Sequence, residues 1–140
     1  MSVRPAIIPN IRYADAPAAI DFLCRGFGFT KHAVYPDANQ PNCIAHAQLV
    51  RDGQMIMVSS AQQTPFAAAA PMATVAEAGA NTQSIYVVLD DIDDHASVAR
   101  QQGGDIFMGP EDQPQGGRSY SVRDPEGNAW TFGSYDPYAS

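Results

Sequence analysis

The sequence predicts an α+β protein in which one βαβββ unit occurs twice in tandem. Aspartates suited to capping a helix stand at Asp15 and Asp91, 76 residues apart (91 − 15). Glycines suited to tight hairpin turns stand at Gly53 and Gly127, 74 residues apart (127 − 53). An amphipathic helical stripe follows each aspartate, and alternating strand patterns surround each glycine. Two caps and two hairpins at nearly one spacing indicate an internal duplication.

The first unit begins with a predicted strand over Ala6–Tyr13 and a helix that Asp15 caps. Pro17 falls in the first turn of this helix, where its missing N–H costs nothing. The apolar side chains repeat at helical spacing, at Ile20, Leu23, Cys24 and Phe27. Gly28 is placed to end the helix in the left-handed conformation. Three strands are predicted next, with a tight Asp-Gly turn between the last two: Thr30–Tyr35, Cys43–Val50 and Gln54–Ser59.

The second unit repeats the pattern, with a strand over Ser84–Leu89 and a helix capped by Asp91. One face of this helix carries Ile92, Ala96, Ala99 and Gly103. Four acidic residues surround its start, where the helix dipole favours negative charge, and a cation site is the alternative interpretation: Asp90, Asp91, Asp93 and Asp94. Three strands complete the unit: Asp105–Met108, Arg118–Arg123 and Asn128–Tyr135.

The stretch Ser60–Thr82 is rich in alanine and shows neither helical nor strand periodicity. We interpret it mainly as a linker between the two units, although Phe66 and Met72 would also suit a lid over a site. The expected organisation is therefore one domain over residues 1–140, with module 1 at about 4–60, a linker at about 61–82 and module 2 at about 83–136.

The composition excludes several classes of partner. Eight basic residues against fifteen acidic ones give a net charge of −7, which argues against binding to nucleic acid or to an anionic membrane surface. The sequence has no secretion signal and no apolar run long enough to span a membrane, so we expect a cytoplasmic protein.

Three motifs give the chain a family resemblance that covers nearly its whole length: Phe27-Gly-Phe29, Val87-Val-Leu-Asp-Asp91 and Asp124-Pro-Glu-Gly-Asn128. With the duplication, they resemble the vicinal oxygen chelate superfamily, which includes glyoxalase I, extradiol dioxygenases and bleomycin-resistance proteins. The resemblance implies two tandem βαβββ modules that form a curved mixed sheet around a shared cleft. It also implies a homodimer, the commonest assembly of soluble oligomers.

Metal-dependent members of this superfamily hold their ion with His, Gln or Glu from four strands. The resemblance assigns the four ligand positions to Ile8, Met57, Ser84 and Thr131. None of these is a good ligand for a divalent metal with a nitrogen or oxygen preference. The chain therefore resembles the metal-free members, and we expect no metal and no cofactor. A metal-dependent lyase, isomerase or dioxygenase of the same fold is the alternative.

Strand alternation predicts which side chains face the cleft. Ile11, Tyr13, Trp130 and Phe132 are assigned to the helix side, and His95 to the surface of its helix. The predicted cleft residues are Asn10, Arg12, His46, Gln48, Met55, Met57, Tyr86, Arg118, Tyr120 and Thr131.

Apolar walls with a few polar groups suit a small, partly aromatic ligand. In another interpretation, the methionines and tyrosines simply fill a closed cleft. Catalysis without metal, with His46 or Tyr120 as acid or base, is a further hypothesis.

Overall fold

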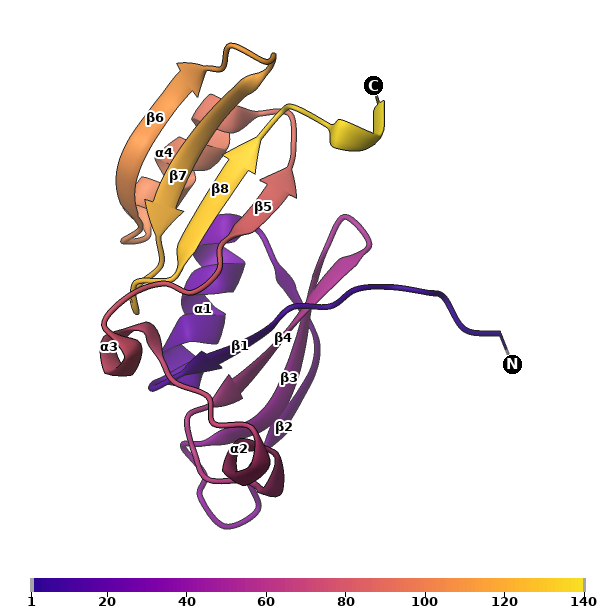
Figure 1. Cartoon of the computed structure of the whole chain (residues 1–140), viewed down its shortest axis with the longest axis vertical. Helices are drawn as coiled ribbons and strands as arrows, with labels where there is room; N and C mark the ends of the chain where they lie inside the picture. The colour runs from indigo at the N-terminus through magenta and orange to yellow at the C-terminus, as the bar shows by residue number, and fades with distance from the viewer. Residues whose placement is uncertain (1, 140) are drawn as a thin grey trace.

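The structure, a computed structural model that describes residues 2–139, contains one four-stranded sheet in each half of the chain (Figure 1). The first half contributes α1 (Ala16–Phe27) and the strands β1 (Asn10–Tyr13), β2 (Thr30–Pro36), β3 (Ile44–Arg51) and β4 (Gln54–Ser60). The second half contributes α4 (Ile92–Gln101) and the strands β5 (Ile85–Val88), β6 (Asp105–Asp112), β7 (Arg118–Arg123) and β8 (Ala129–Gly133). The strand orders are β1-β4-β3-β2 and β5-β8-β7-β6. The predicted α+β fold of two βαβββ modules is confirmed.

The pairing register shows that the two modules correspond residue by residue. In the first sheet Asn10 lies opposite Met57, and in the second Tyr86 lies opposite Thr131, both in parallel pairs. These partners are related by the same offsets of 76 and 74 that relate the aspartates and the hairpin glycines. The duplication therefore extends from the turns into the hydrogen-bonded register of the strands.

The correspondence between β3 and β7 differs by one residue from the sequence expectation. Leu49 lies opposite Ile56, and Val122 lies opposite Trp130, so the offset along these strands is 73 (122 − 49) and not 74. The reason is the length of the turns. The first hairpin closes tightly over Asp52 and Gly53, while the second closes over Asp124–Asn128. Because side chains alternate between faces, this slip exchanges the two faces of β7.

One hydrophobic core lies on the helix side of both sheets, and α1 and α4 pack against each other within it. In Figure 1, α4 lies behind β7. Trp130 is fully buried, as predicted, with its ring 5.2 Å from that of Phe27 at the end of α1 and 5.9 Å from that of Phe29. The core thus joins the C-terminal end of the first helix to the last strand of the second module.

The turn Asp124–Asn128 also joins the modules through polar contacts. Asp124 is buried, and its carboxylate accepts hydrogen bonds from the hydroxyl of Tyr13 in β1 (2.6 Å) and the indole N–H of Trp130 (3.3 Å). It also accepts from the backbone N–H groups of Glu126 and Asn128, both at 3.0 Å. Burial and the neighbouring Asp124 carboxylate raise the pKa of Tyr13 well above its usual value, so the phenol stays a donor.

The same turn caps the first helix from outside its own module. The Glu126 carboxylate accepts from the backbone N–H groups of Ala14 (2.7 Å) and Asp15 (2.8 Å). The Asp15 side chain accepts from the Ala18 N–H at 3.2 Å, as expected of a cap. Asp91 occupies the equivalent position before α4, but its side chain makes no capping hydrogen bond.

The segment between the modules contains two short helices, α2 (Pro65–Ala69) and α3 (Val75–Ala78), which the sequence pattern did not indicate. Each begins at a threonine cap, and Thr74 forms a reciprocal capping box with Glu77. The segment ends against module 2, where the Asn81 side chain donates to the Gly127 carbonyl and accepts from the Ala129 N–H.

Several element boundaries differ from the prediction. The first strand begins at Asn10 and not at Ala6, because Pro9 has no N–H to donate to a strand ladder. Residues 2–9 form an extended arm that projects from the body of the molecule (Figure 1). β6 extends to Asp112, and α4 ends at Gln101, which leaves Gly103 outside the helix. Within residues 2–139, no helix is long and apolar enough to cross a membrane.

Candidate functional site

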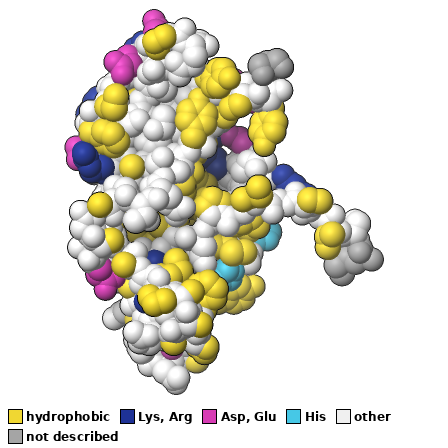
Figure 2. Space-filling view, in the orientation of Figure 1, with side chains coloured by type: hydrophobic (Ala, Val, Ile, Leu, Met, Phe, Trp, Pro, Cys, Tyr) yellow, Lys and Arg dark blue, Asp and Glu magenta, His cyan; other side chains and the backbone are white. Residues whose placement is uncertain are grey.

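A hollow of about 590 Å³ lies between the two modules. It is bounded by the N-terminal arm, by β4 and the turn before it, by β5, and by the C-terminal 3-10 helix η1 (Pro137–Ala139). Figure 2 shows hydrophobic side chains around the hollowed side of the molecule between the upper module and the arm. We call this the inter-module hollow; its principal side chains are Ile7, Met55, Tyr86, Val88, Asp136 and Tyr138.

Two of the predicted cleft residues, Met55 and Tyr86, line the inter-module hollow. The Tyr86 hydroxyl donates to the Tyr135 carbonyl at 2.7 Å, while 43% of the residue stays exposed. Its ring crosses Gly133, where an added Cβ would lie 2.4 Å from the hydroxyl oxygen. Glycine at position 133 therefore allows the ring to lie close against β8 and holds it as a fixed wall.

Three more predicted residues lie on the open face of the first sheet, opposite α1: His46, Gln48 and Met57, all half-buried. The Gln48 side-chain nitrogen is 3.1 Å from His46 Nε2, and the ring of His46 stacks on Tyr35 with centroids 6.1 Å apart. Tyr35 is 55% exposed and extends this face toward solvent. The sequence reasoning missed Tyr35, although its cross-strand pairing with His46 would have indicated it.

The remaining predicted residues are divided among other places. Asn10 and Arg12 line a separate crevice beneath residues 71–83. Thr131 lies on the open face of the second sheet, where its hydroxyl is 2.7 Å from that of Ser121. Arg118 and Tyr120 lie on the helix side of β7, because of the one-residue slip described above. The expectation that these two face the cleft is therefore wrong.

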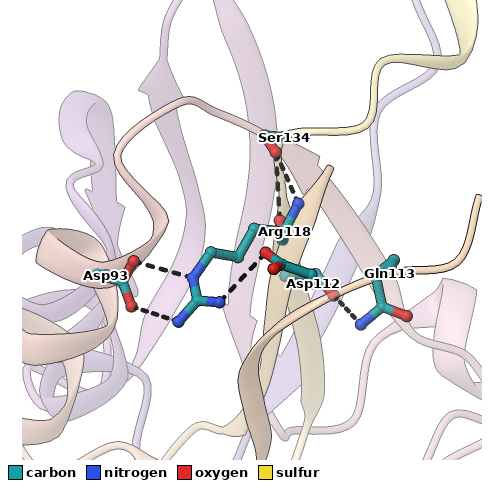
Figure 3. A network of polar contacts seen from close by, with 6 residues as sticks. Asp93, Asp112, Gln113, Arg118 and Ser134 are labelled. Carbon is teal, nitrogen blue, oxygen red and sulfur yellow. Dashed lines mark hydrogen bonds and ion pairs between the residues drawn. The ribbon is translucent and has the colours of Figure 1, made fainter. Parts of the chain in front are cut away.

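Arg118 is held at the edge of the second sheet by acidic partners (Figure 3). Its Nε and Nη2 donate to the two carboxylate oxygens of Asp93 in α4, at 2.9 and 3.0 Å, and Nη1 donates to Asp112 at 3.3 Å. The hydrogen bonds from Arg118 lower the pKa of Asp93, and its ion pairs raise the pKa of Arg118. Asp93 therefore serves a structural ion pair, and within residues 2–139 the acidic cluster forms no group of side chains that could hold a metal ion.

Tyr120 is buried, and its hydroxyl meets Nδ1 of His95 at 2.5 Å. The second nitrogen, Nε2, lies 3.0 Å from the Phe27 carbonyl, which also accepts from Arg51 Nε at 2.9 Å. Since a carbonyl only accepts, Nε2 carries the proton and Nδ1 accepts from the Tyr120 hydroxyl. The expectation that His95 is a surface residue is wrong, because it connects the end of α1 to α4 and β7.

The position of His95 predicts a pH-dependent stability. Burial lowers the pKa of His95, so the unfolded chain takes up a proton more readily than the folded one. The stabilising contribution is complete above the unfolded pKa of about 6.5 and is lost as the pH falls through the lower folded pKa. Urea unfolding should therefore show a loss of stability between neutral and mildly acidic pH that is smaller in His95→Gln. The matched change at the exposed His32, His32→Gln, should retain the wild-type dependence; equal profiles for all three proteins would contradict this role.

The four positions that the resemblance assigns to a metal do not fit one. Ile8 offers a hydrocarbon, Met57 a thioether, and the Thr131 hydroxyl is already hydrogen-bonded. Ser84 is exposed just before β5. A divalent ion needs several nitrogen, oxygen or sulfur donors at close range with partners that orient them. These residues do not supply such a set.

The tandem modules, the parallel pairing of first and last strands and the hollow between them define a glyoxalase-type fold. The chain belongs to the Glyoxalase/Bleomycin resistance protein/Dioxygenase superfamily, whose family model matches residues 7–132.

An uncharacterized protein of Mycobacterium bovis is 27% identical over 133 residues, which cover 95% of this chain and 85% of that protein.

Among solved structures, TioX from Micromonospora sp. ML1 has a TM-score of 0.73 at 29% identity and covers 93% of this chain and 98% of its own. TnmS3, an antibiotic binding protein from Streptomyces sp. CB03234, has a TM-score of 0.65 at 19% identity, with 95% and 97% covered. A family enzyme from Burkholderia phytofirmans PsJN has a TM-score of 0.66 at 16% identity, with 89% and 93% covered. At these two lower identities the likeness concerns the fold.

Proposed function

We propose that this protein binds a small, partly aromatic molecule in the inter-module hollow without using a metal ion. The observation that carries the proposal is the hollow itself, a volume of about 590 Å³ with a thioether and an aromatic wall from different modules. Ligand sites are concave, mainly apolar and provided with a few polar groups at fixed positions. Here Arg51, Gln54 and Asp136 supply polar groups around the apolar walls.

The chemistry of the lining favours recognition over catalysis. Tyr86 is hydrogen-bonded to the backbone, and burial is the main factor that raises its pKa, so it is suited to ring contact and not to proton transfer at neutral pH. Tyr120, considered above as an acid or base, is buried beneath the second sheet, and burial raises its pKa too. The antibiotic binding protein among the structural neighbours shows that this fold can hold a small molecule.

The proposal includes a homodimer. Both open sheet faces and the arm carry exposed apolar groups, such as Tyr35, Met108 and Ile7, that a second copy would cover. A monomeric mass by light scattering at micromolar concentration would contradict this part of the proposal and leave the binding part to be tested separately.

Binding can be tested with N-phenyl-1-naphthylamine, a neutral aromatic probe whose fluorescence rises in apolar sites. We expect saturable binding that Met55→Ala weakens about threefold and Tyr86→Ala about tenfold, because each removes part of a wall. The matched control is Met108→Ala, an exposed methionine outside the hollow, which should bind like the wild type. Unsaturable binding, or equal affinity in all four proteins, would contradict the site.

A further inference from the structure

A second cavity, separate from the inter-module hollow, lies between β1 and the segment that joins the modules. Its volume is about 340 Å³, and residues 71–83 form much of its wall. We call it the linker crevice. Apolar side chains line one part of it, including Met72 and Val75, and polar ones line the rest, including Asn10, Arg12 and Thr74.

Most of the buried polar groups around the linker crevice have partners. Thr74 is bonded to Glu77, and Asn81 is bonded to the backbone of the second module. Asn128 donates to the Asp124 carboxylate. These groups hold the wall in place and have little capacity left for a ligand.

Arg12 is the exception. Its Nη2 donates to the Gln62 carbonyl at 2.7 Å, but Nε is buried and has no hydrogen-bond partner, the one such side-chain nitrogen or oxygen among the described residues. None of the ion pairs within residues 2–139 includes Arg12. Buried polar groups are hydrogen-bonded in most proteins, so an unpartnered donor beside a cavity needs an explanation.

The nearby acidic groups do not provide a partner for Nε. The negative charge of Glu77 interacts with Arg12 at a distance, but its carboxylate is occupied by the N–H and hydroxyl of Thr74. The Asp37 carboxylate accepts from the side chain of Gln62. The guanidinium therefore keeps a full positive charge and an unused N–H next to the crevice.

We propose that the linker crevice binds the carboxylate of a small organic acid, with Arg12 as the group that recognises the charge. Guanidinium and carboxylate match in geometry and form short, charge-assisted hydrogen bonds. Nε is covered in this conformation, so the guanidinium turns toward the crevice as the acid enters. Met72 and Val75 then contact the apolar body of the acid. This site is independent of the function proposed for the inter-module hollow.

Benzoate and its neutral analogue benzamide test the proposal, because they share size and shape and differ in charge. In a two-dimensional NMR titration, benzoate should shift the backbone amides of Arg12, Thr74 and Asn81 in a saturable manner. Benzamide should bind at least about tenfold more weakly, and Arg12→Gln should remove most of the preference for the acid. Arg12→Lys, which keeps the charge without the planar donor edge, should fall between the two.

Two controls keep the result interpretable. Arg123→Gln removes an arginine from an exposed ion pair with Asp105 and should leave benzoate binding unchanged. Ala78→Phe fills the crevice from the exposed face of α3 and should abolish binding while Arg12 is intact. Equal binding of benzoate and benzamide, shifts confined to other parts of the chain, or wild-type binding by Arg12→Gln or Ala78→Phe would overturn the proposal.

Discussion

Replacement of Asp124 by alanine is expected to lower the free energy of unfolding by roughly 3–5 kcal/mol. The carboxylate is 3% exposed and accepts hydrogen bonds from Tyr13, Trp130 and the backbone of its own turn. Its removal leaves these buried donors without an acceptor and breaks a contact between the modules. Hydrogen bonds to a charged group contribute more than neutral ones, so the loss exceeds that of an ordinary turn residue.

Urea unfolding followed by circular dichroism measures this effect. The conservative change Asp124→Asn keeps the shape and loses one acceptor oxygen, so it should cost less than the alanine variant. Asp112→Ala removes an exposed carboxylate from the ion pair with Arg118 and should change stability by no more than about 0.5 kcal/mol. A loss below about 1 kcal/mol for Asp124→Ala would show that the turn does not join the modules as described.

Replacement of Trp130 by alanine should cost a similar amount, roughly 3–5 kcal/mol, for a different reason. The indole ring is fully buried between strands and the end of α1, against Phe27, Phe29 and Phe132. Alanine would leave a cavity that these three rings cannot close, while Trp130→Phe retains part of the contact and should cost under about 2 kcal/mol.

The chain has one tryptophan, so the native protein itself gives a second readout. Its fluorescence should be blue-shifted and poorly quenched by iodide. Unfolding of the variants is followed by circular dichroism, with Tyr138→Ala as the control because that residue is 98% exposed. A red-shifted, readily quenched emission in the folded protein would contradict the burial of Trp130.

The sequence was sufficient to predict the fold because the duplicated signals are local. A capping aspartate, an apolar stripe and a hairpin glycine each act within a few residues, so their repetition is visible without coordinates. The same reasoning placed Met55 and Met57 away from the helix side, since β4 follows directly from its tight turn and has no uncertainty in register.

The site was harder to predict because it depends on register and on distant contacts. Arg118 and Tyr120 were assigned to the wrong face by a slip of one residue, which arose from the longer turn after β7. His95 lies inside because a hydrogen bond to Phe27, 68 residues away, satisfies its ring, and no local pattern contains that contact. The two chain ends at the inter-module hollow also carry no local signal of their position.

The central claim, binding of a small molecule without a metal, is tested most directly by one titration. The naphthylamine probe is added to protein treated with EDTA and to the same protein supplied with Zn²⁺ or Mn²⁺. We expect the same saturable isotherm in each case, because Ile8, Met57, Ser84 and Thr131 provide no ligand set for an ion. Binding that is absent in EDTA and restored in proportion to one bound metal per chain would contradict the account.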